Sequence, residues 1–294
     1  MCEEITVSQW IDRWLPISST SAYARELNAY YTGKLSKAFG ERPIRSIRNA
    51  DVQKFAIDMS SYSFSLVDKL RITTNKLFSA AIENGYILRS PTSGVQWDYA
   101  SKGTHRAIED WEKDTITAHW QEHRCGIWAM LMLYAGLRRG EALALEWEDI
   151  DLENKTIRVR QAIHFDGNAA VLGDTKTDAG VRSIPIVGTL YNALKSLEQS
   201  QKRVCGDHMT ESVFVRGWES YLVKMTSLCG REFNIRTHDL RHTFCTALYR
   251  AGVGVKEAQY LMGHRDVQTT MKIYTHIDGA DITKAAAALE RFWG

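Results

Sequence analysis

Apolar side chains recur every three or four residues through the first part of the chain, at the spacing that places them on one face of an α-helix. The first such segment, residues 6–15, opens with Thr6, whose hydroxyl favours the N-terminal cap of a helix. Further helices are predicted over residues 21–38, after residues 49–51, and over residues 63–84. The last of them precedes Gly85, a residue type that readily adopts the left-handed conformation at a helix end. The pattern predicts an all-helical N-terminal region.

This periodicity ends near residue 90. Two clusters of turn-forming residues follow, Ser90-Pro91-Thr92-Ser93-Gly94 and Ser101-Lys102-Gly103-Thr104, with no periodic pattern between them. Such a stretch is typical of the connection between two domains. We therefore expect a helical domain over residues 1–90, a linker over residues 91–106 and a second domain over residues 107–294.

The second part combines helical periodicity with short alternating segments. Helices are predicted over residues 110–119 and 126–135, from residue 190, and beyond residue 237 apart from short turns. Residues 156–160 and 181–186 alternate between apolar and polar side chains as strands do, and Asp166-Gly167 is typical of a hairpin turn. The predicted fold class is mainly α with a small antiparallel β-sheet, a helical domain being followed by an α+β domain.

The composition is that of an ordinary globular protein, with 44% hydrophobic and 24% charged residues. The longest apolar stretch, residues 127–135, has about half the length that a bilayer crossing needs, and the acidic N-terminus lacks the apolar core of a secretory signal. The five cysteines are scattered, without a Cys-x-x-Cys pair, so we expect free thiols in a reducing cytosol. We expect no membrane partner.

Four short segments of the second domain contain closely spaced basic, histidine and hydroxyl side chains. They are Gly136-Leu137-Arg138-Arg139-Gly140-Glu141, Thr175-Lys176-Thr177, His238-Asp239-Leu240-Arg241-His242, and Leu261-Met262-Gly263-His264 with Tyr274 ten residues after the histidine. The formal net charge is only +2, so any contact with nucleic acid must come from local clusters of this kind.

In this order, the four segments resemble those of the tyrosine site-specific recombinases, in particular the integrases of phages and conjugative transposons. The resemblance covers nearly the whole chain. The Thr6-Val7-x-x-Trp10 opening is similar to the start of the family's helical core-binding domain, which has a SAM-like fold. Ser90-Pro91 resembles the segment with which that domain ends. It implies that the catalytic residues are Arg138, Lys176, His238, Arg241, His264 and the nucleophile Tyr274.

The chemistry of DNA cleavage explains why such residues belong together. A tyrosine hydroxyl has a pKa of about 10 and needs help to attack a phosphodiester. The resemblance implies that Arg138 and Arg241 neutralise the non-bridging oxygens, and that Lys176 protonates the leaving 5′ oxygen. His238 and His264 would hydrogen-bond the phosphate and assist proton movement. The resulting 3′-phosphotyrosine retains the energy of the broken bond, so we expect no metal, ATP or other cofactor.

Each residue also has a simpler interpretation. The two arginines are equally compatible with a cap or an interhelical salt bridge, Lys176 with a solvated hairpin tip, and Tyr274 with an aromatic side chain at the edge of the core. His238 and His242, four residues apart on one helix face, have the spacing of metal ligands, although the neighbouring Arg241 repels a cation.

Three alternative functions remain open at this point. A non-catalytic DNA-binding regulator would assign no special role to Tyr274. A metal-dependent nuclease or protease would lose activity with a chelator. A type IB topoisomerase shares the covalent chemistry, although the small helical domain favours site-specific recombination.

The resemblance further implies partners and a location. We expect the protein to bind double-stranded DNA and to form a tetramer on two DNA sites during integration or excision of a mobile element. The expected location is the cytoplasm, in association with the nucleoid. Accessory excision factors and host DNA-bending factors are possible additional partners. Lys69, Arg71 and Lys76 are candidates for DNA-backbone contacts. An apolar stripe on the C-terminal segment, residues 282–293, is expected to pack either on its own domain or on a neighbouring subunit.

Two departures from the family pattern stand out. The chain begins almost directly at the helix of Trp10, without the additional arm-binding domain of many integrases, which indicates a simple system or a truncated form. Gly140 occupies a position where the family often has serine, a difference that we expect to affect helix capping more than chemistry.

Overall fold

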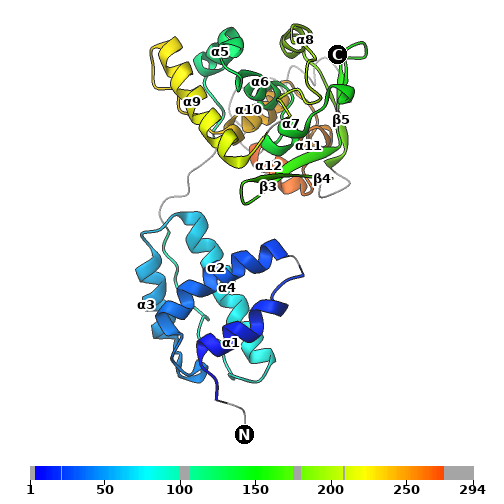
Figure 1. Cartoon of the computed structure of the whole chain (residues 1–294). Helices are drawn as coiled ribbons and strands as arrows, with labels where there is room; N and C mark the ends of the chain where they lie inside the picture. The colour runs from blue at the N-terminus through cyan, green and yellow to red at the C-terminus, as the bar shows by residue number, and fades with distance from the viewer. Residues whose placement is uncertain (1–3, 21, 100–105, 175–179, 208, 275–294) are drawn as a thin grey trace, which may run out of the picture. The chain divides into compact units, whose positions relative to one another are not determined.

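The computed structural model describes residues 4–20, 22–99, 106–174, 180–207 and 209–274. The chain divides into two compact units, Met1–Thr104 and His105–Gly294, each with its own apolar core (Figure 1). Helices predominate and the strands form small antiparallel sheets, so the predicted fold class is confirmed. No described helix combines the length and the apolarity that crossing a membrane demands.

In its described part the first unit is a bundle of the helices α1 (Val7–Trp14), α2 (Ala22–Phe39), α3 (Asn49–Met59) and α4 (Phe64–Glu83). α1 begins as predicted, because the Thr6 hydroxyl accepts a hydrogen bond from the backbone N–H of Gln9. Trp10 fastens α1 to α4 by donating its indole N–H to the carbonyl oxygen of Leu77, at 3.0 Å. Gly85, at φ +75°, ends α4 in the left-handed conformation that the sequence indicated.

Part of the segment expected to be a linker packs on this first unit. Asn49, at the start of α3, donates hydrogen bonds to the carbonyl oxygens of Pro91 and Ser93, at 3.2 and 2.7 Å. The side chain of Trp97 is buried in the same core as α1 and α4. Residues 91–97 therefore belong structurally to the helical unit.

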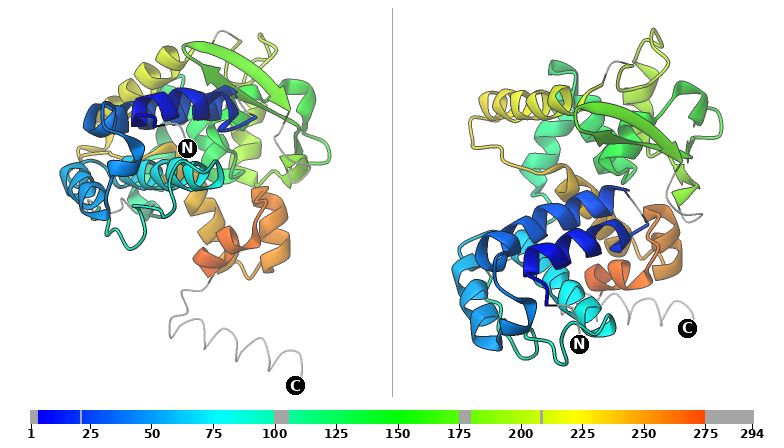
Figure 2. Two further views of the ribbon diagram at one scale, coloured as in Figure 1. Left: turned by 90° about the horizontal axis from the view of Figure 1, so that it is seen from below. Right: turned by 60° about the horizontal axis from the view of Figure 1, so that its bottom comes forward.

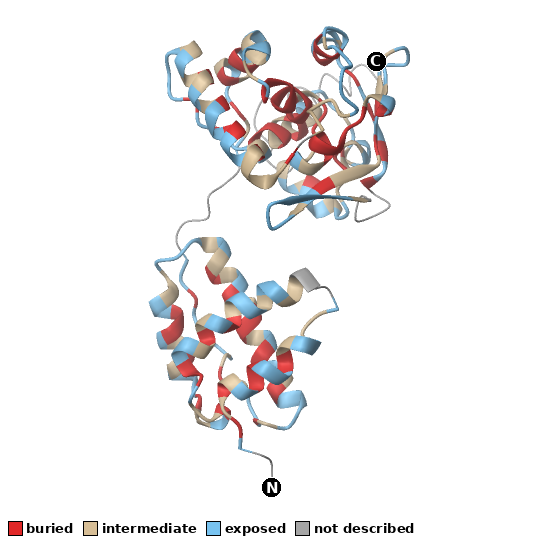
Figure 3. Cartoon of the chain, viewed as in Figure 1, coloured by how far each residue is buried: buried red, intermediate tan, exposed pale blue. Residues whose placement is uncertain are grey.

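The second unit surrounds a central helix, α6 (Gly126–Tyr134), which is buried from Gly126 to Leu133 (Figure 3). The other described helices are α5 (Asp110–His119), α7 (Arg139–Ala144), α8 (Gly188–Lys195), α9 (Glu211–Cys229), α10 (Thr237–Arg250), α11 (Val255–Met262) and α12 (Val267–Tyr274). α10 packs against α6, and α11 and α12 pack against each other (Figure 2). The C-terminal stripe within residues 282–293 lies outside the described residues.

The strands of this unit form two antiparallel sheets. β1 (Ile150–Asp151), β2 (Thr156–Val159) and β5 (Arg182–Pro185) are hydrogen-bonded in the order β1-β2-β5. β3 (Gln161–Asp166) and β4 (Ala169–Asp174) form a long hairpin ribbon that is clear in both views of Figure 2. Its turn contains Gly167 at φ +54°, so the predicted hairpin is confirmed.

Gly140 permits a close contact between the second unit's helices and this hairpin. It lies within α7, two residues after the N-cap position occupied by Arg138. A Cβ atom at Gly140 would lie 2.3 Å from the carbonyl oxygen of Ile163 in β3. The structure gives this position a packing role that the sequence did not indicate, because the missing side chain lets α7 approach the backbone of β3.

A Gly140→Ala variant is expected to lose about 1–3 kcal/mol of stability, because the new methyl group forces α7 and β3 apart. Thermal or urea unfolding measures the loss. Gly188→Ala is the matched control, since it lies at the first residue of α8 and an added Cβ there meets no atom within 4 Å. Equal midpoints for the two variants would contradict the close-packing explanation.

Candidate active site

Arg138 enters the site from the turn between α6 and α7. Gly136 makes this turn at φ +61°, and a Cβ there would lie 2.2 Å from the ring of Phe244, so both conformation and space require glycine. The Arg138 guanidinium donates to Glu141 Oε1 and to the carbonyl oxygen of Gly263, both at 2.6 Å. Its side chain remains 40% exposed, so a ligand has access to it.

Glu141 lies at the centre of a buried ionic cluster. Arg182 donates two hydrogen bonds to its carboxylate, at 2.8 and 3.2 Å, and Arg241 Nη1 lies 3.8 Å from Oε2. Burial acts to raise the pKa of Glu141, but the hydrogen bonds and charge of Arg182, together with the charges of Arg138 and Arg241, outweigh it and lower the pKa to about 2. The group is therefore a carboxylate at neutral pH and holds three guanidinium groups together.

Arg241, in α10, is almost completely buried. Its two terminal nitrogens donate to the carbonyl oxygens of Gly136 and Met262, which join the turn after α6 to the end of α11. Burial and the charge of Arg138 lower the pKa of Arg241 to about 9, which still leaves it protonated at neutral pH. These two bonds occupy only part of its five N–H donors, so the charge and further donors remain for an anion.

His264 follows α11, which ends at Gly263 in a left-handed conformation, φ +60°. Its Nδ1 lies 2.9 Å from the hydroxyl of Thr270. Burial, followed by the positive charges of Arg241 and Arg138, lowers the pKa of His264 to about 4. His238, exposed in the first turn of α10, contributes to the same lowering. The structure thus brings together four candidate residues, Arg138, His238, Arg241 and His264.

The imidazole of His264 is expected to stay neutral in the folded protein down to about pH 5, whereas an unfolded histidine titrates near ~6.5. Between its folded and unfolded pKa values the unfolded chain binds more protons, so this group lowers stability as the pH falls from about 6.5 towards 4. NMR titration of the ring protons measures it, with a His264→Asn variant to identify the signals. A folded-state midpoint near that of the urea-unfolded protein would contradict the burial.

Tyr274 lies at the end of α12 with its hydroxyl buried and without a hydrogen-bond partner. Its ring packs edge-on against Tyr249, with 5.0 Å between the ring centroids. Burial, with smaller contributions from Cys245 and Glu257, raises the pKa of Tyr274 to about 12. The Tyr274 hydroxyl therefore makes no hydrogen bond to Arg138 or Arg241 within the described residues.

The remaining candidates divide into two groups. Lys176 lies outside the described residues, in the segment after β4. Lys69 and Lys76 are exposed on α4, whereas Arg71 forms an ion pair with Asp68, at 2.9 Å, which raises the pKa of Arg71. Its charge is therefore partly compensated within the same helix, and the two lysines are the better placed for an external anion.

Sequence reasoning did not assign a role to Glu141 or Arg182. Glu141 belongs to one of the motifs given above. Its position between three arginines could not be predicted, because Arg182 and Arg241 lie more than forty positions from it in the sequence. Arg182 did leave a trace in the sequence. It occupies the same alternating face of β5 as the buried Ile184, and a charged residue at an inward position of a strand indicates a buried ion pair.

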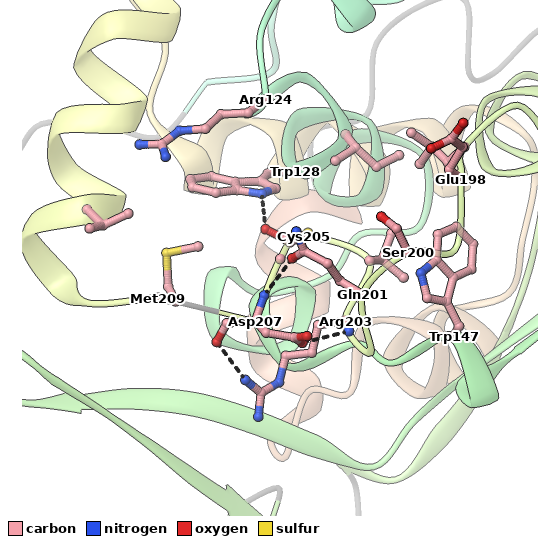
Figure 4. A pocket seen from close by; sticks show the side chains of 15 residues that line it. Arg124, Trp128, Trp147, Glu198, Ser200, Gln201, Arg203, Cys205, Asp207 and Met209 are labelled. Atoms are coloured by element: carbon pink, nitrogen blue, oxygen red, sulfur yellow. Dashed lines mark hydrogen bonds between the residues drawn. The ribbon is translucent and has the colours of Figure 1, made fainter.

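The second unit also contains a pocket away from the arginine cluster. Within the described residues, no group of three or more His, Cys, Asp or Glu is arranged to hold a metal ion. A pocket of about 390 Å³ lies between α6 and the segment before α9 (Figure 4). It is lined by Trp128, Trp147 and the Arg203–Asp207 loop, and by none of the candidate catalytic residues. The pocket is therefore separate from the arginine cluster.

Residues 114–280 match the model of the phage integrase family, and the chain belongs to that family. It is 27% identical over 285 residues to the transposase from transposon Tn916 of Enterococcus faecalis, covering 86% of this chain and 68% of the relative. An integrase of Staphylococcus phage L54a is 34% identical over 160 residues, 48% of this chain and 45% of the relative.

Solved structures agree on the fold. The integrase of transposon Tn1549, in complex with a circular intermediate DNA, superimposes with a TM-score of 0.80 at 21% identity, covering 98% of this chain and 99% of that one. A lambda integrase dimer bound to a COC′ core site gives a TM-score of 0.67 at 17% identity, covering 94% and 80%. The protein is thus a tyrosine recombinase of the phage and transposon integrase type, an enzyme of site-specific DNA recombination, as the sequence predicted.

Proposed function

We propose that this protein cleaves and rejoins DNA at the arginine–histidine cluster, with Tyr274 as the nucleophile and Arg138, Lys176, His238, Arg241 and His264 as the catalytic side chains. The observation that carries this proposal is the convergence of Arg138 and Arg241 on Glu141, with His264 close enough to feel the charge of both arginines, from three separate sequence segments. Three guanidinium groups around one carboxylate leave a net positive charge, which suits a phosphodiester.

In the proposed reaction the phosphate lies against Arg138 and Arg241, which stabilise the additional negative charge of five-coordinate phosphorus. The Tyr274 oxygen bonds to phosphorus and gives up its proton, while the bond from phosphorus to the 5′ oxygen breaks. Lys176 protonates this leaving oxygen. His264 is neutral at physiological pH and is suited to accept or relay a proton, and exposed His238 hydrogen-bonds the phosphate. The reverse sequence, with a different 5′ hydroxyl, rejoins the strand.

Cleavage requires Tyr274 to leave the position that the structure shows. Its hydroxyl is buried beside Cys245 and Glu257, and its pKa of about 12 disfavours the phenolate there. An unpartnered buried hydroxyl costs roughly 1–3 kcal/mol, so this position is not strongly held. We infer that DNA binding is accompanied by a displacement of the end of α12 that brings the hydroxyl to the arginines.

The two units divide the work in this proposal. The helical unit binds DNA through exposed cations such as Lys69 and Lys76, and the α+β unit supplies the chemistry. Exchange between two DNA sites needs four strand cleavages, so four copies of the chain assemble on two duplexes, with or without accessory DNA-bending or excision proteins. Because the substrate is the DNA of a mobile element and its host, the protein acts in the cytoplasm at the nucleoid.

Covalent trapping tests the function. The full chain is incubated with a nicked half-site whose cleavage releases a short oligonucleotide, so that the strand cannot be rejoined, and the adduct is digested and mapped by mass spectrometry. The expected product carries the DNA 3′ phosphate on Tyr274, with equal yield in EDTA. DNA binding without any adduct would indicate a non-catalytic regulator, and loss of cleavage in EDTA would indicate a metal-dependent nuclease.

A further inference from the structure

At the far end of α4 from Lys69, three arginines surround a hollow of about 610 Å³. One wall is the turn after α2, with Arg45, Ile47 and Arg48, and the other is the segment from Gly85 to Arg89 that follows α4. The left-handed Gly85 makes this arrangement possible, because it reverses the chain and returns Leu88 and Arg89 alongside the turn.

The charge of this hollow is not compensated by its own walls. Among the residues that line it, none is acidic. Asp51, on α3, accepts two hydrogen bonds from Arg42, at 2.8 and 3.0 Å, and one from the backbone N–H of Arg48, and the charge of Arg48 helps to lower its pKa. No ion pair in the described part of the chain involves Arg45, Arg48 or Arg89. Asp51 therefore offsets part of the charge of Arg48, but not that of Arg45 or Arg89. Like charges that line one hollow repel one another, and an anion relieves that repulsion.

One of these side chains is held in place before any ligand binds. Arg45 Nε donates to the carbonyl oxygen of Tyr86, at 3.2 Å, which fixes the guanidinium over the second wall. Arg13, from α1, is anchored close by through a hydrogen bond of 2.9 Å to the Tyr86 hydroxyl. The remaining donors of Arg45 have no partner among the described residues. A planar, oriented guanidinium with four available N–H donors matches the paired oxygens of a phosphate.

We propose that this hollow is a second phosphodiester-binding site of the helical unit, separate from Lys69 and Lys76 on α4. Sixteen residues of α-helical rise, about 24 Å, separate Lys69 from Gly85. A duplex that contacts both regions would therefore be held over about seven base pairs, at 3.4 Å per base pair along one strand. The proposal rests on the proposed function, since it takes DNA as the substrate.

Salt-dependent DNA binding of an Arg45→Ala/Arg89→Ala variant tests the site. The probe is a 40-base-pair duplex of arbitrary sequence, and Tyr274→Phe is present in every protein so that cleavage does not interfere. Loss of two phosphate contacts is expected to reduce the slope of log affinity against log salt by about 1.8. Accordingly, the affinity ratio of parent to variant should fall about tenfold between 50 and 200 mM salt.

Lys37→Ala/Lys54→Ala is the matched control, because it removes two exposed charges of the same unit outside the hollow. An unchanged slope for the arginine variant, or equal changes in both variants, would overturn the proposal. A change in self-association, measured by sedimentation, with an unchanged DNA slope would also overturn it and would identify the hollow as a protein contact. Covalent trapping with Tyr274 restored tests the proposed function separately from the hollow. At saturating protein concentration, the Arg45→Ala/Arg89→Ala variant should still form the covalent protein–DNA adduct.

Discussion

A Tyr274→Phe variant is expected to bind DNA with unchanged affinity and to form no covalent protein–DNA adduct. The change removes one oxygen atom, and in the proposed reaction that atom makes the bond to phosphorus. No neighbouring water can replace it in a linkage to the protein, so adduct formation should fall by about four orders of magnitude or more, to below detection. Half-site trapping measures the adduct, and a gel-shift or anisotropy titration measures the binding.

The same variant should be slightly more stable than the parent, which separates catalytic loss from unfolding. The Tyr274 hydroxyl is buried without a hydrogen-bond partner, so its removal relieves a desolvation cost of roughly 1 kcal/mol. Tyr260→Phe is the matched control, because this exposed tyrosine loses only a hydrogen bond with the backbone N–H of Ser183. An adduct retained by Tyr274→Phe, or lost equally by Tyr260→Phe, would reject the assignment.

The elements that sequence alone predicts well are those whose signals are local. A capping threonine at residue 6, a left-handed glycine at residue 85 and an Asp166-Gly167 turn each act within a few residues, and all three are found in the structure. The candidate catalytic motifs also lie within short segments. Each is recognisable from its own residue types, although the meeting of Arg138 and Arg241 around Glu141 is a property of the folded unit.

The features that the sequence did not predict depend on contacts between distant segments. Residues 91–97 read as a linker because they lack periodicity, yet Trp97 is buried against the helical core. From the sequence, Gly140 appeared to affect a helix cap. In the structure it also allows close packing, because a side chain there would collide with the carbonyl oxygen of Ile163 in β3. The buried position of Tyr274 is likewise set by packing against Tyr249. Pattern analysis contains no information about which surfaces meet.

Arg182 should be nearly as important for activity as the residues that contact the phosphate. An Arg182→Met variant is expected to lose about 3–5 kcal/mol of stability, because it leaves Glu141 buried without the two hydrogen bonds and the charge of Arg182. The carboxylate would then pull more strongly on Arg138 and Arg241, and the arginine pair would lose its geometry. We therefore expect strand cleavage to be lost at a temperature where the variant is still folded.

Acid unfolding gives an independent measure of the same change. Glu141 has a pKa of about 2 when folded and about 4.3 when unfolded, so it stabilises the fold above about pH 4.3 and loses that contribution as the pH falls towards 2. Without Arg182, the folded pKa of Glu141 rises, and the acid-unfolding midpoint should move to higher pH. Circular dichroism, followed from about neutral pH down to about pH 2, the folded pKa of Glu141, would record the shift of the acid-unfolding midpoint.

The control must separate a positioning role of Arg182 from a general need for ion pairs. Arg160→Met removes a guanidinium from another ionic cluster, in which Arg160 pairs with Glu146, Glu148 and Asp149 and not with Glu141. It should lower stability without a specific loss of cleavage when rates are compared at equal folded fraction and saturating DNA. Arg182→Lys, which retains the charge but not the paired geometry, should restore stability in part and cleavage less. A residue that orients Arg138 and Arg241 through Glu141 must change the cleavage rate of the folded enzyme. If the cleavage rate instead follows the folded fraction in all three variants, Arg182 supports only the fold.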